Sequence, residues 1–405
     1  GDGGGGGGGG GGPTPAGAKL DEEGYLWWDE ATGVCTYFQD RRRKWPFTAG
    51  VTGKAQLCAL VSANAALRAR NLQLLSAAGA EPDRVAQEGE RLYVEKPTLR
   101  GDANVTWSYD EYGHPGLQLY YLKLKAWQRF TETYALLERA GRRGLFNAPP
   151  PTGRPLRIAA LGGGPGYELL AARRYLASRG LEGRGTVELI NSDAQPTWKG
   201  YSEALGFRFF TFDIFDGGLV ERCRDACARG ADDADAGQGS GQAGGDITGG
   251  SGSSGQAASE GTGGGAGARE VDLSPSPPDP YAIDYLILSY VCIYVAKTPG
   301  DPRHESVCDE LARLLQPAGG VRAVLVSERS EETAVCRMME ARGVTVERLM
   351  CQDLGRDERQ SVLLSAAAAP LPHPPPTRDS ERDLTFPNVP FEEHKVKRGG
   401  ARGAG

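Results

Sequence analysis

The stretch RIAALGGGPGYELLAARRYL, Arg157–Leu176, joins a short apolar run to a glycine-rich turn and then to a run with helical periodicity. The apolar residues at 156–161 predict a buried strand, and the residues from about Gly166 to Ser178 predict a helix. The turn between them holds four glycines and a proline, so the backbone can pass close to a ligand where a Cβ would clash. A strand, tight turn and helix in this order predict the ligand-binding end of an α/β sheet.

The residues after this stretch alternate between apolar runs and amphipathic runs. The further apolar runs lie at 186–193, 207–216, 282–295, 321–329, 344–349 and 361–365. Near-continuous apolar strands separated by helices are typical of a parallel sheet covered on both faces. The last two runs have no helix between them, so they predict an antiparallel pair. The expected fold class is α/β: a doubly wound, mostly parallel seven-stranded sheet with an antiparallel edge hairpin, plus a helical N-terminal extension.

Composition divides the chain into folded and unfolded parts. Glycine supplies 59 of the 405 residues, and the tracts at 1–19 and about 230–269 hold too few apolar side chains to offset the entropy of ordering. We expect a disordered arm, a disordered insert and, at 366–405, a disordered tail. The folded parts are then an aromatic hairpin at 20–47, a mainly helical extension at 48–150 and the sheet domain at 151–365.

Charge and cysteine content narrow the function classes. The formal net charge of −6 does not support a broad nucleic-acid-binding face, although it leaves room for local basic clusters. The longest apolar runs are far short of a membrane span, so we expect no membrane partner. The eight cysteines are scattered, which is typical of reduced thiols in a cytoplasmic or nuclear protein, and we expect no bound metal.

The glycine spacing separates three classes of ligand. The dinucleotide fingerprint G-x-G-x-x-G needs a third glycine at the position that Tyr167 occupies. No Lys-Ser or Lys-Thr pair follows the loop, which excludes the phosphate loop of nucleotide triphosphatases. An NAD-dependent oxidoreductase is disfavoured also because the chain has no convincing proton-relay histidine or Tyr-x-x-x-Lys. A ligand without a phosphate is the remaining class.

A G-x-G-x-G turn after a first strand, with a glutamate just inside the next helix, resembles motif I of the class I (seven-stranded, Rossmann-like) S-adenosylmethionine-dependent methyltransferases. The residues that carry the motif are Leu161, Gly162, Gly163, Gly164, Pro165, Gly166 and Glu168. The resemblance covers about Arg157 to Ser365. It implies that S-adenosylmethionine is the cofactor and that the protein is a methyltransferase. The acceptor is not identified: it is a protein, an RNA or a small molecule.

The resemblance also assigns roles to residues at the strand ends. Asp193 matches the carboxylate that takes the ribose hydroxyls, and Asp213 matches the residue near the adenine amine, with Ile214 in the apolar adenine slot. The loop after the fourth strand faces the transferred methyl group, so Ser289 and Tyr290 are the candidate catalytic residues. From the residues alone, Asp193 also fits a cap of the following helix.

Residues 20–47 show a weaker, partial resemblance to a WW module. Tyr25, Trp27, Trp28 and Tyr37 follow the spacing of a WW hairpin around the turn sequence DEATG. A WW module would bind a Pro-rich peptide. The alternative is an aromatic hairpin packed on the methyltransferase-like domain as a cap. The main rival to an enzyme is therefore a non-catalytic interaction protein, with a WW-like hairpin on a methyltransferase-fold scaffold.

Overall fold

The computed structural model describes residues 17–39, 46–96, 107–147, 153–181, 187–236, 281–295, 301–317, 319–329, 331–351, 358–366 and 368–387. Most of the expected glycine arm, the expected insert from residue 237 onward and the end of the expected tail lie outside these residues. Within them, no helix is long and apolar enough to cross a membrane.

The central sheet has seven strands in the order β10-β11-β9-β8-β5-β6-β7. Their bounds are β5 Leu156–Leu161, β6 Val187–Asp193, β7 Arg208–Thr211, β8 Tyr285–Ser289, β9 Ala323–Glu328, β10 Thr345–Arg348 and β11 Arg359–Leu364. Strands β7, β6, β5, β8 and β9 pair in parallel, whereas β11 is antiparallel to both β9 and β10. This confirms the predicted fold class. Because β6 and β8 flank β5 on opposite sides, the strand order reverses at β5.

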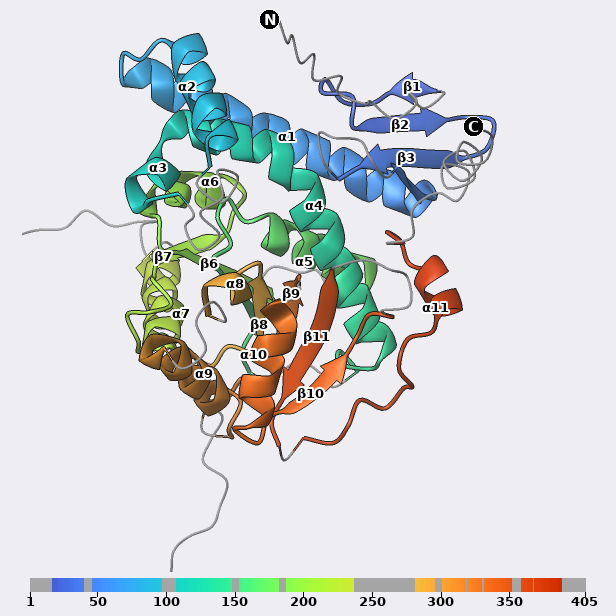
Figure 1. Cartoon of the computed structure of the whole chain (residues 1–405), viewed down its shortest axis with the longest axis vertical. Helices are drawn as coiled ribbons and strands as arrows, with labels where there is room; N and C mark the ends of the chain where they lie inside the picture. The colour runs from blue at the N-terminus through green and yellow to red at the C-terminus, as the bar shows by residue number, and fades with distance from the viewer. Residues whose placement is uncertain are drawn as a thin grey trace, which may run out of the picture.

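Helices cover both faces of this sheet (Figure 1). One face carries α4 Pro115–Arg142, α5 Tyr167–Ser178 and α6 Lys199–Ala204, and the other carries α7 Leu219–Ala236, α8 Cys292–Val295, α9 Pro302–Leu314 and α10 Glu331–Glu340. Successive strand residues point to opposite faces, so Ile287 joins the first core while Leu286 and Leu288 join the second. Burial on both faces explains why the strands are continuous apolar runs. Helix α7 extends to Ala236, seven residues into the segment expected to be disordered.

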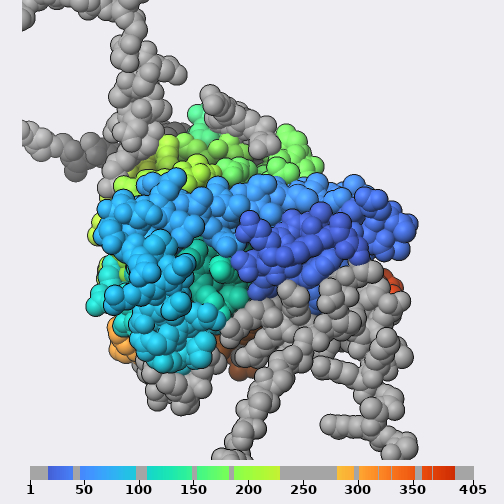
Figure 2. Space-filling view, turned by 90° about the horizontal axis from the view of Figure 1, so that it is seen from above, coloured from blue at the N-terminus to red at the C-terminus, as the bar shows by residue number. Residues whose placement is uncertain are grey.

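The N-terminal extension is helical, as predicted. Its helices are α1 Val51–Ala77, α2 Pro82–Val94, α3 Tyr109–Gly113 and the start of α4. Helices α2 and α4 approach closely at Gly89 and Gly116, since a Cβ on Gly89 would lie 1.9 Å from the Gly116 carbonyl carbon. The side chain of His114 caps α4, where its Nδ1 accepts the N–H of Leu117 at 3.4 Å. Seen from above, α1, α2 and the N-terminal strands spread across one side of the molecule (Figure 2).

Residues 18–49 form a four-stranded antiparallel sheet, and the WW resemblance is not supported. The strands are β1 Ala18–Lys19, β2 Leu26–Asp29, β3 Val34–Phe38 and β4 Pro46–Ala49. The rings of Tyr25, Trp27 and Tyr37 are at most 6% exposed. Tyr25 stacks on Trp127 of α4 with the ring centroids 5.9 Å apart. Because these rings belong to the core, they offer no aromatic face to a Pro-rich peptide, and the alternative of a packed cap describes this segment.

The prediction of a disordered tail from residue 366 is wrong for residues 368–387. This segment includes α11 Arg378–Arg382, and Glu381 is 1% exposed in an ion pair with Arg139 of α4. Phe386 is fully buried, with its ring centroid 5.1 Å from that of Tyr134 and 5.8 Å from that of Tyr37. One buried ion pair and one aromatic side chain therefore fix a segment whose composition alone predicted disorder.

Candidate functional site

A cavity of about 310 Å³ opens at the carboxyl ends of β5, β6 and β8. Ligands of doubly wound sheets bind at this edge, where the strand order reverses. The volume lies at the lower end of the ~300–1,000 Å³ range of small-molecule sites. The described residues that line it are Trp107, Tyr109, Tyr112, Tyr121, Arg129, Leu161, Gly162, Gly164, Asp193, Ala194, Gln195, Trp198, Phe212, Asp213, Ile214, Phe215, Tyr290, Val291 and Tyr294.

The glycines of the turn after β5 divide into two kinds. Gly162, Gly164 and Gly166 have φ of 63°, 50° and 98°, in the left-handed region that favours glycine. A Cβ on Gly164 would find its nearest side-chain neighbour, Trp198, 3.8 Å away, so this position is open to the cavity. A Cβ on Gly163 would lie 2.1 Å from the Asn191 side chain, and one on Gly166 would lie 2.9 Å from Phe207. Of the predicted cofactor glycines, two therefore line the cavity and two allow close packing.

Asp193 ends β6 and faces the cavity beside this turn. Its Oδ2 accepts the N–H of Gly164 at 2.9 Å, and its Oδ1 accepts the N–H of Gln195 at 2.9 Å. Gln195, rather than Asp193, caps the short helix Pro196–Trp198 that follows. A carboxylate has about four acceptor positions, which leaves two for a ligand. Burial raises the pKa of Asp193 to about 6.

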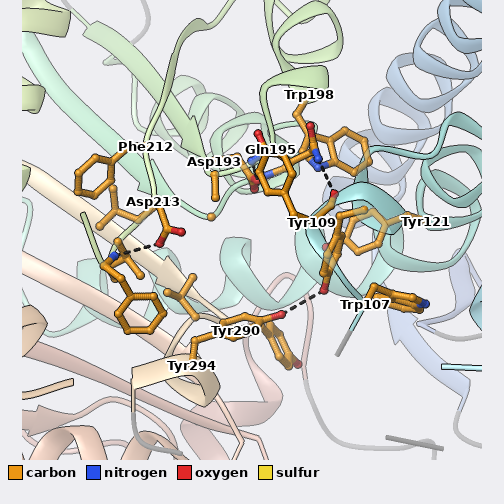
Figure 3. Close-up of a pocket in the computed structure, with 18 of the residues that line it drawn as sticks. Trp107, Tyr109, Tyr121, Asp193, Gln195, Trp198, Phe212, Asp213, Tyr290 and Tyr294 are labelled. Atoms are coloured by element: carbon orange, nitrogen blue, oxygen red, sulfur yellow. Dashed lines mark hydrogen bonds between the residues drawn. The ribbon is translucent and has the colours of Figure 1, made fainter. Parts of the chain in front are cut away.

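An apolar slot lies beyond Asp193, next to the end of β7. Asp213 lines the slot, and its Oδ1 accepts the N–H of Phe215 at 3.0 Å. Phe212, Ile214 and Phe215 supply apolar walls. In the close-up, Phe212 and Asp213 lie across the cavity from Trp198 and Tyr121 (Figure 3). An apolar slot with a carboxylate beside it fits a planar base that carries an amino group.

The two candidate catalytic residues have supporting contacts. Ser289 is 2% exposed and is not among the described lining residues; its carbonyl and Oγ accept from Arg129 Nη1 at 2.9 and 3.0 Å. Tyr290 lines the cavity and has a φ of 59°, the only positive φ of a non-glycine residue in the part of the chain that the structure describes. Its hydroxyl donates to Glu132 and accepts from Gln128, both on α4. Burial raises the pKa of Tyr290 well above its ordinary value, which does not favour a proton-accepting role.

Glu168, in the first turn of α5, is also a supporting residue and is absent from the lining set above. It is 3% exposed, and its Oε1 lies 3.7 Å from Arg129 Nε. Burial raises its pKa to about 7, although the charge of Arg129 acts in the opposite direction. The carboxyl therefore lies between Arg129 of the N-terminal extension and the start of α5.

The N-terminal extension, which the sequence predicted as a helical region over the mouth of the site, contributes side chains to the cavity that the sequence did not single out. Trp107, Tyr109 and Tyr112 come from α3 and the residues before it, and Arg129 comes from the middle of α4. The hydroxyls of Tyr112 and Tyr294 lie 3.1 Å apart, which joins α3 to α8 across the opening. The sequence contains one indication that α4 contributes to a polar site. Residues 128–133 are almost all polar, although the helix is otherwise rich in apolar side chains.

Comparisons with known proteins give matches among solved structures only. No protein-family model and no curated protein sequence matches the chain. Among solved structures, it is similar to the CMeT domain of the citrinin polyketide synthase, at 12% identity over 74% of this chain and 69% of that one, with a TM-score of 0.38. It is similar to an O-methyltransferase family protein from Burkholderia thailandensis, at 10% identity over 70% and 72% of the two chains, with a TM-score of 0.35. For a TehB-like SAM-dependent methyltransferase from Corynebacterium glutamicum the identity is 11% over 58% and 87%, with a TM-score of 0.29.

The fold of this chain is established by the strand order and parallel pairing of its own sheet. The chain has a seven-stranded, mostly parallel α/β sheet, and the solved structures to which it is similar include a SAM-dependent methyltransferase.

Proposed function

We propose that the protein is an S-adenosylmethionine-dependent methyltransferase whose methyl donor lies in the cavity at the carboxyl ends of β5, β6 and β8, with its adenine in the slot beside β7. The observation that carries this proposal is the contact between Gly164 and Asp193. The N–H of Gly164 donates to the Asp193 carboxylate at 2.9 Å, while the missing Cβ of Gly164 leaves the cavity open at that point. A left-handed glycine and an oriented carboxylate thus meet at the strand end where a nucleoside would bind.

The lining residues fit the parts of this donor in order. The adenine would lie between Phe212, Ile214 and Phe215, with its amino group near Asp213. The ribose hydroxyls would donate to the two free acceptor positions of Asp193, each bond to the charged group contributing about 1.5–3 kcal/mol. The amino-acid part would run along Gly162 and Gly164 toward Tyr290.

When bound, the donor supplies an electrophilic methyl group for an in-line displacement, and the protein contributes positioning. The loop after β8 faces this end of the cavity, and its shape depends on the contacts of Ser289 and Tyr290 with α4. Trp107, Tyr109 and Tyr294 border the same end, where they would exclude water and pack against an apolar or planar part of the acceptor.

Gly164→Ala, matched with Gly180→Ala, tests this proposal. Both glycines have a positive φ, 50° and 70°, so each alanine costs about 1–2 kcal/mol of backbone strain. A Cβ on Gly180 meets nothing within 4 Å, whereas a Cβ on Gly164 would enter the cavity. In a transfer assay with methyl-tritiated S-adenosylmethionine and cell lysate, we expect label in one acceptor fraction with wild type and Gly180→Ala, and at least tenfold less with Gly164→Ala.

The fractions of that assay also identify the acceptor, because protein, RNA and small molecules are counted separately. Donor binding without transfer by any variant would support the non-catalytic scaffold instead. Equal transfer by Gly164→Ala and Gly180→Ala would contradict the placement of the donor.

A further inference from the structure

Arg129 is the only cationic side chain among the described residues that line the cavity. It lies in the middle of α4, a helix of the N-terminal extension, and its side chain is 12% exposed. Burying most of a guanidinium is costly unless its donors find acceptors. Here the Nε is buried and makes no hydrogen bond to the described residues. Its nearest carboxylate, on Glu168, is 3.7 Å away, beyond hydrogen-bonding distance.

The guanidinium is nevertheless held in place from two sides. Its Nη1 donates to both the carbonyl and the Oγ of Ser289 at 2.9 and 3.0 Å. Its Cζ lies 4.0 Å from the centre of the Tyr290 ring, within the range of a cation–π contact. Tyr290 is in turn fixed by Gln128, which directly precedes Arg129 on α4, and by Glu132, about one turn after it. The protein therefore holds a buried cation at the wall of the cavity, and its Nε makes no hydrogen bond to the described residues.

We infer that Arg129 binds the carboxylate of the amino-acid part of the methyl donor, so that a residue of the N-terminal extension selects for the intact donor. This inference rests on the proposed function. The donor carries one anionic group, and a planar guanidinium binds a carboxylate through two parallel hydrogen bonds. Arg129 sits between the first turn of α5 and the end of β8, next to the glycine turn along which the amino-acid part would run.

The other charges in the cavity also favour binding of the donor carboxylate at Arg129. Asp193 and Asp213, the two lining carboxylates, lie on the adenosine side and would repel a carboxylate. Glu168 lies near Arg129 but is buried, and its pKa of about 7 leaves it partly protonated at neutral pH. The Arg129 guanidinium therefore keeps positive charge available to a ligand.

A pair of ligands tests the inference on the unmodified full chain. S-adenosylhomocysteine and its decarboxylated analogue differ only in the carboxylate, and their affinities are measured by titration calorimetry. We expect wild type to bind the decarboxylated analogue about ten- to a hundredfold more weakly, the range for a hydrogen bond to a charged group. Affinities within twofold of each other would overturn the inference.

Variants of Arg129 then assign the effect to this side chain. Arg129→Gln should weaken S-adenosylhomocysteine binding by the same factor and leave binding of the decarboxylated analogue within about threefold, and Arg129→Lys should recover part of the loss. The control is Arg142→Gln, which removes a half-exposed arginine of the same helix and should change neither affinity. An equal loss for both ligands would show that Arg129 only supports the fold, and no loss for either would overturn the inference. Failure of wild type to bind either ligand would instead overturn the donor assignment itself.

Discussion

At the scale of single residues, the glycines of the turn after β5 have two different roles. The sequence pattern treats Gly162–Gly166 as one motif, but the structure opens only Gly162 and Gly164 to the cavity, while Gly163 and Gly166 avoid clashes with Asn191 and Phe207. The motif is therefore partly a packing requirement. Asp193 was predictable because it ends a buried strand next to that turn. Arg129 was not, because its partner Ser289 is 160 residues away and no local periodicity reports such a pairing.

Glu168 should make the stability of the fold depend on pH. Burial raises its folded-state pKa from 4.5 to about 7, so the neutral carboxyl stabilises the fold below pH 4.5 and this contribution is lost as the pH rises through 7. Glu168→Gln cannot ionise. From pH 5 to pH 8.5, wild type should lose roughly 2–3 kcal/mol of unfolding free energy relative to Glu168→Gln. Urea unfolding at both pH values measures this difference, and a parallel change of the two proteins with pH would contradict it. Glu203→Gln, which alters an exposed carboxylate, is the control and should follow wild type.

At the scale of elements, helix α4 connects the parts of the molecule. It carries Arg129 toward the cavity, Trp127 toward the N-terminal sheet and Arg139 toward Glu381 of α11. The strands were predictable since burial on both faces makes them continuous apolar runs. The places where the aromatic hairpin and the C-terminal segment pack could not be predicted, because both segments pack on α4 through contacts between residues far apart in the sequence. The prediction of a hairpin is confirmed by the pairing of β2 with β3. Its resemblance to a WW module is not supported, because its aromatic rings are buried, with Tyr25 stacked on Trp127 of α4.

The C-terminal segment should contribute to the stability of the folded core. Phe386 is fully buried against Tyr37, Phe130 and Tyr134, so it joins the N-terminal sheet to α4. Phe386→Ala should lower the unfolding free energy by about 3–5 kcal/mol. His373→Ala, an exposed residue of the same segment, should change it by less than about 0.5 kcal/mol. Thermal unfolding compares the two variants, and equal midpoints would mean that the C-terminal segment does not contribute to the folded core.

The whole molecule combines a sheet domain with a cover formed by the N-terminal extension. The sheet supplies Gly164, Asp193 and Asp213 at its switch point, and the cover supplies Arg129 and an aromatic wall. The cavity is complete only when both are present, which ties ligand binding to the folding of the full chain. A ligand that binds only the folded state should therefore stabilise the whole protein.

Thermal unfolding of the full chain with S-adenosylhomocysteine, compared with NADH, tests this account most directly. At a ligand concentration of about 100 times Kd, a single site adds about 2.7 kcal/mol to the unfolding free energy. We expect S-adenosylhomocysteine to raise the midpoint by several degrees in a concentration-dependent manner and NADH to leave it unchanged. A midpoint that is unaffected by S-adenosylhomocysteine, or raised by NADH instead, would contradict the assignment of the cavity to a methyl donor.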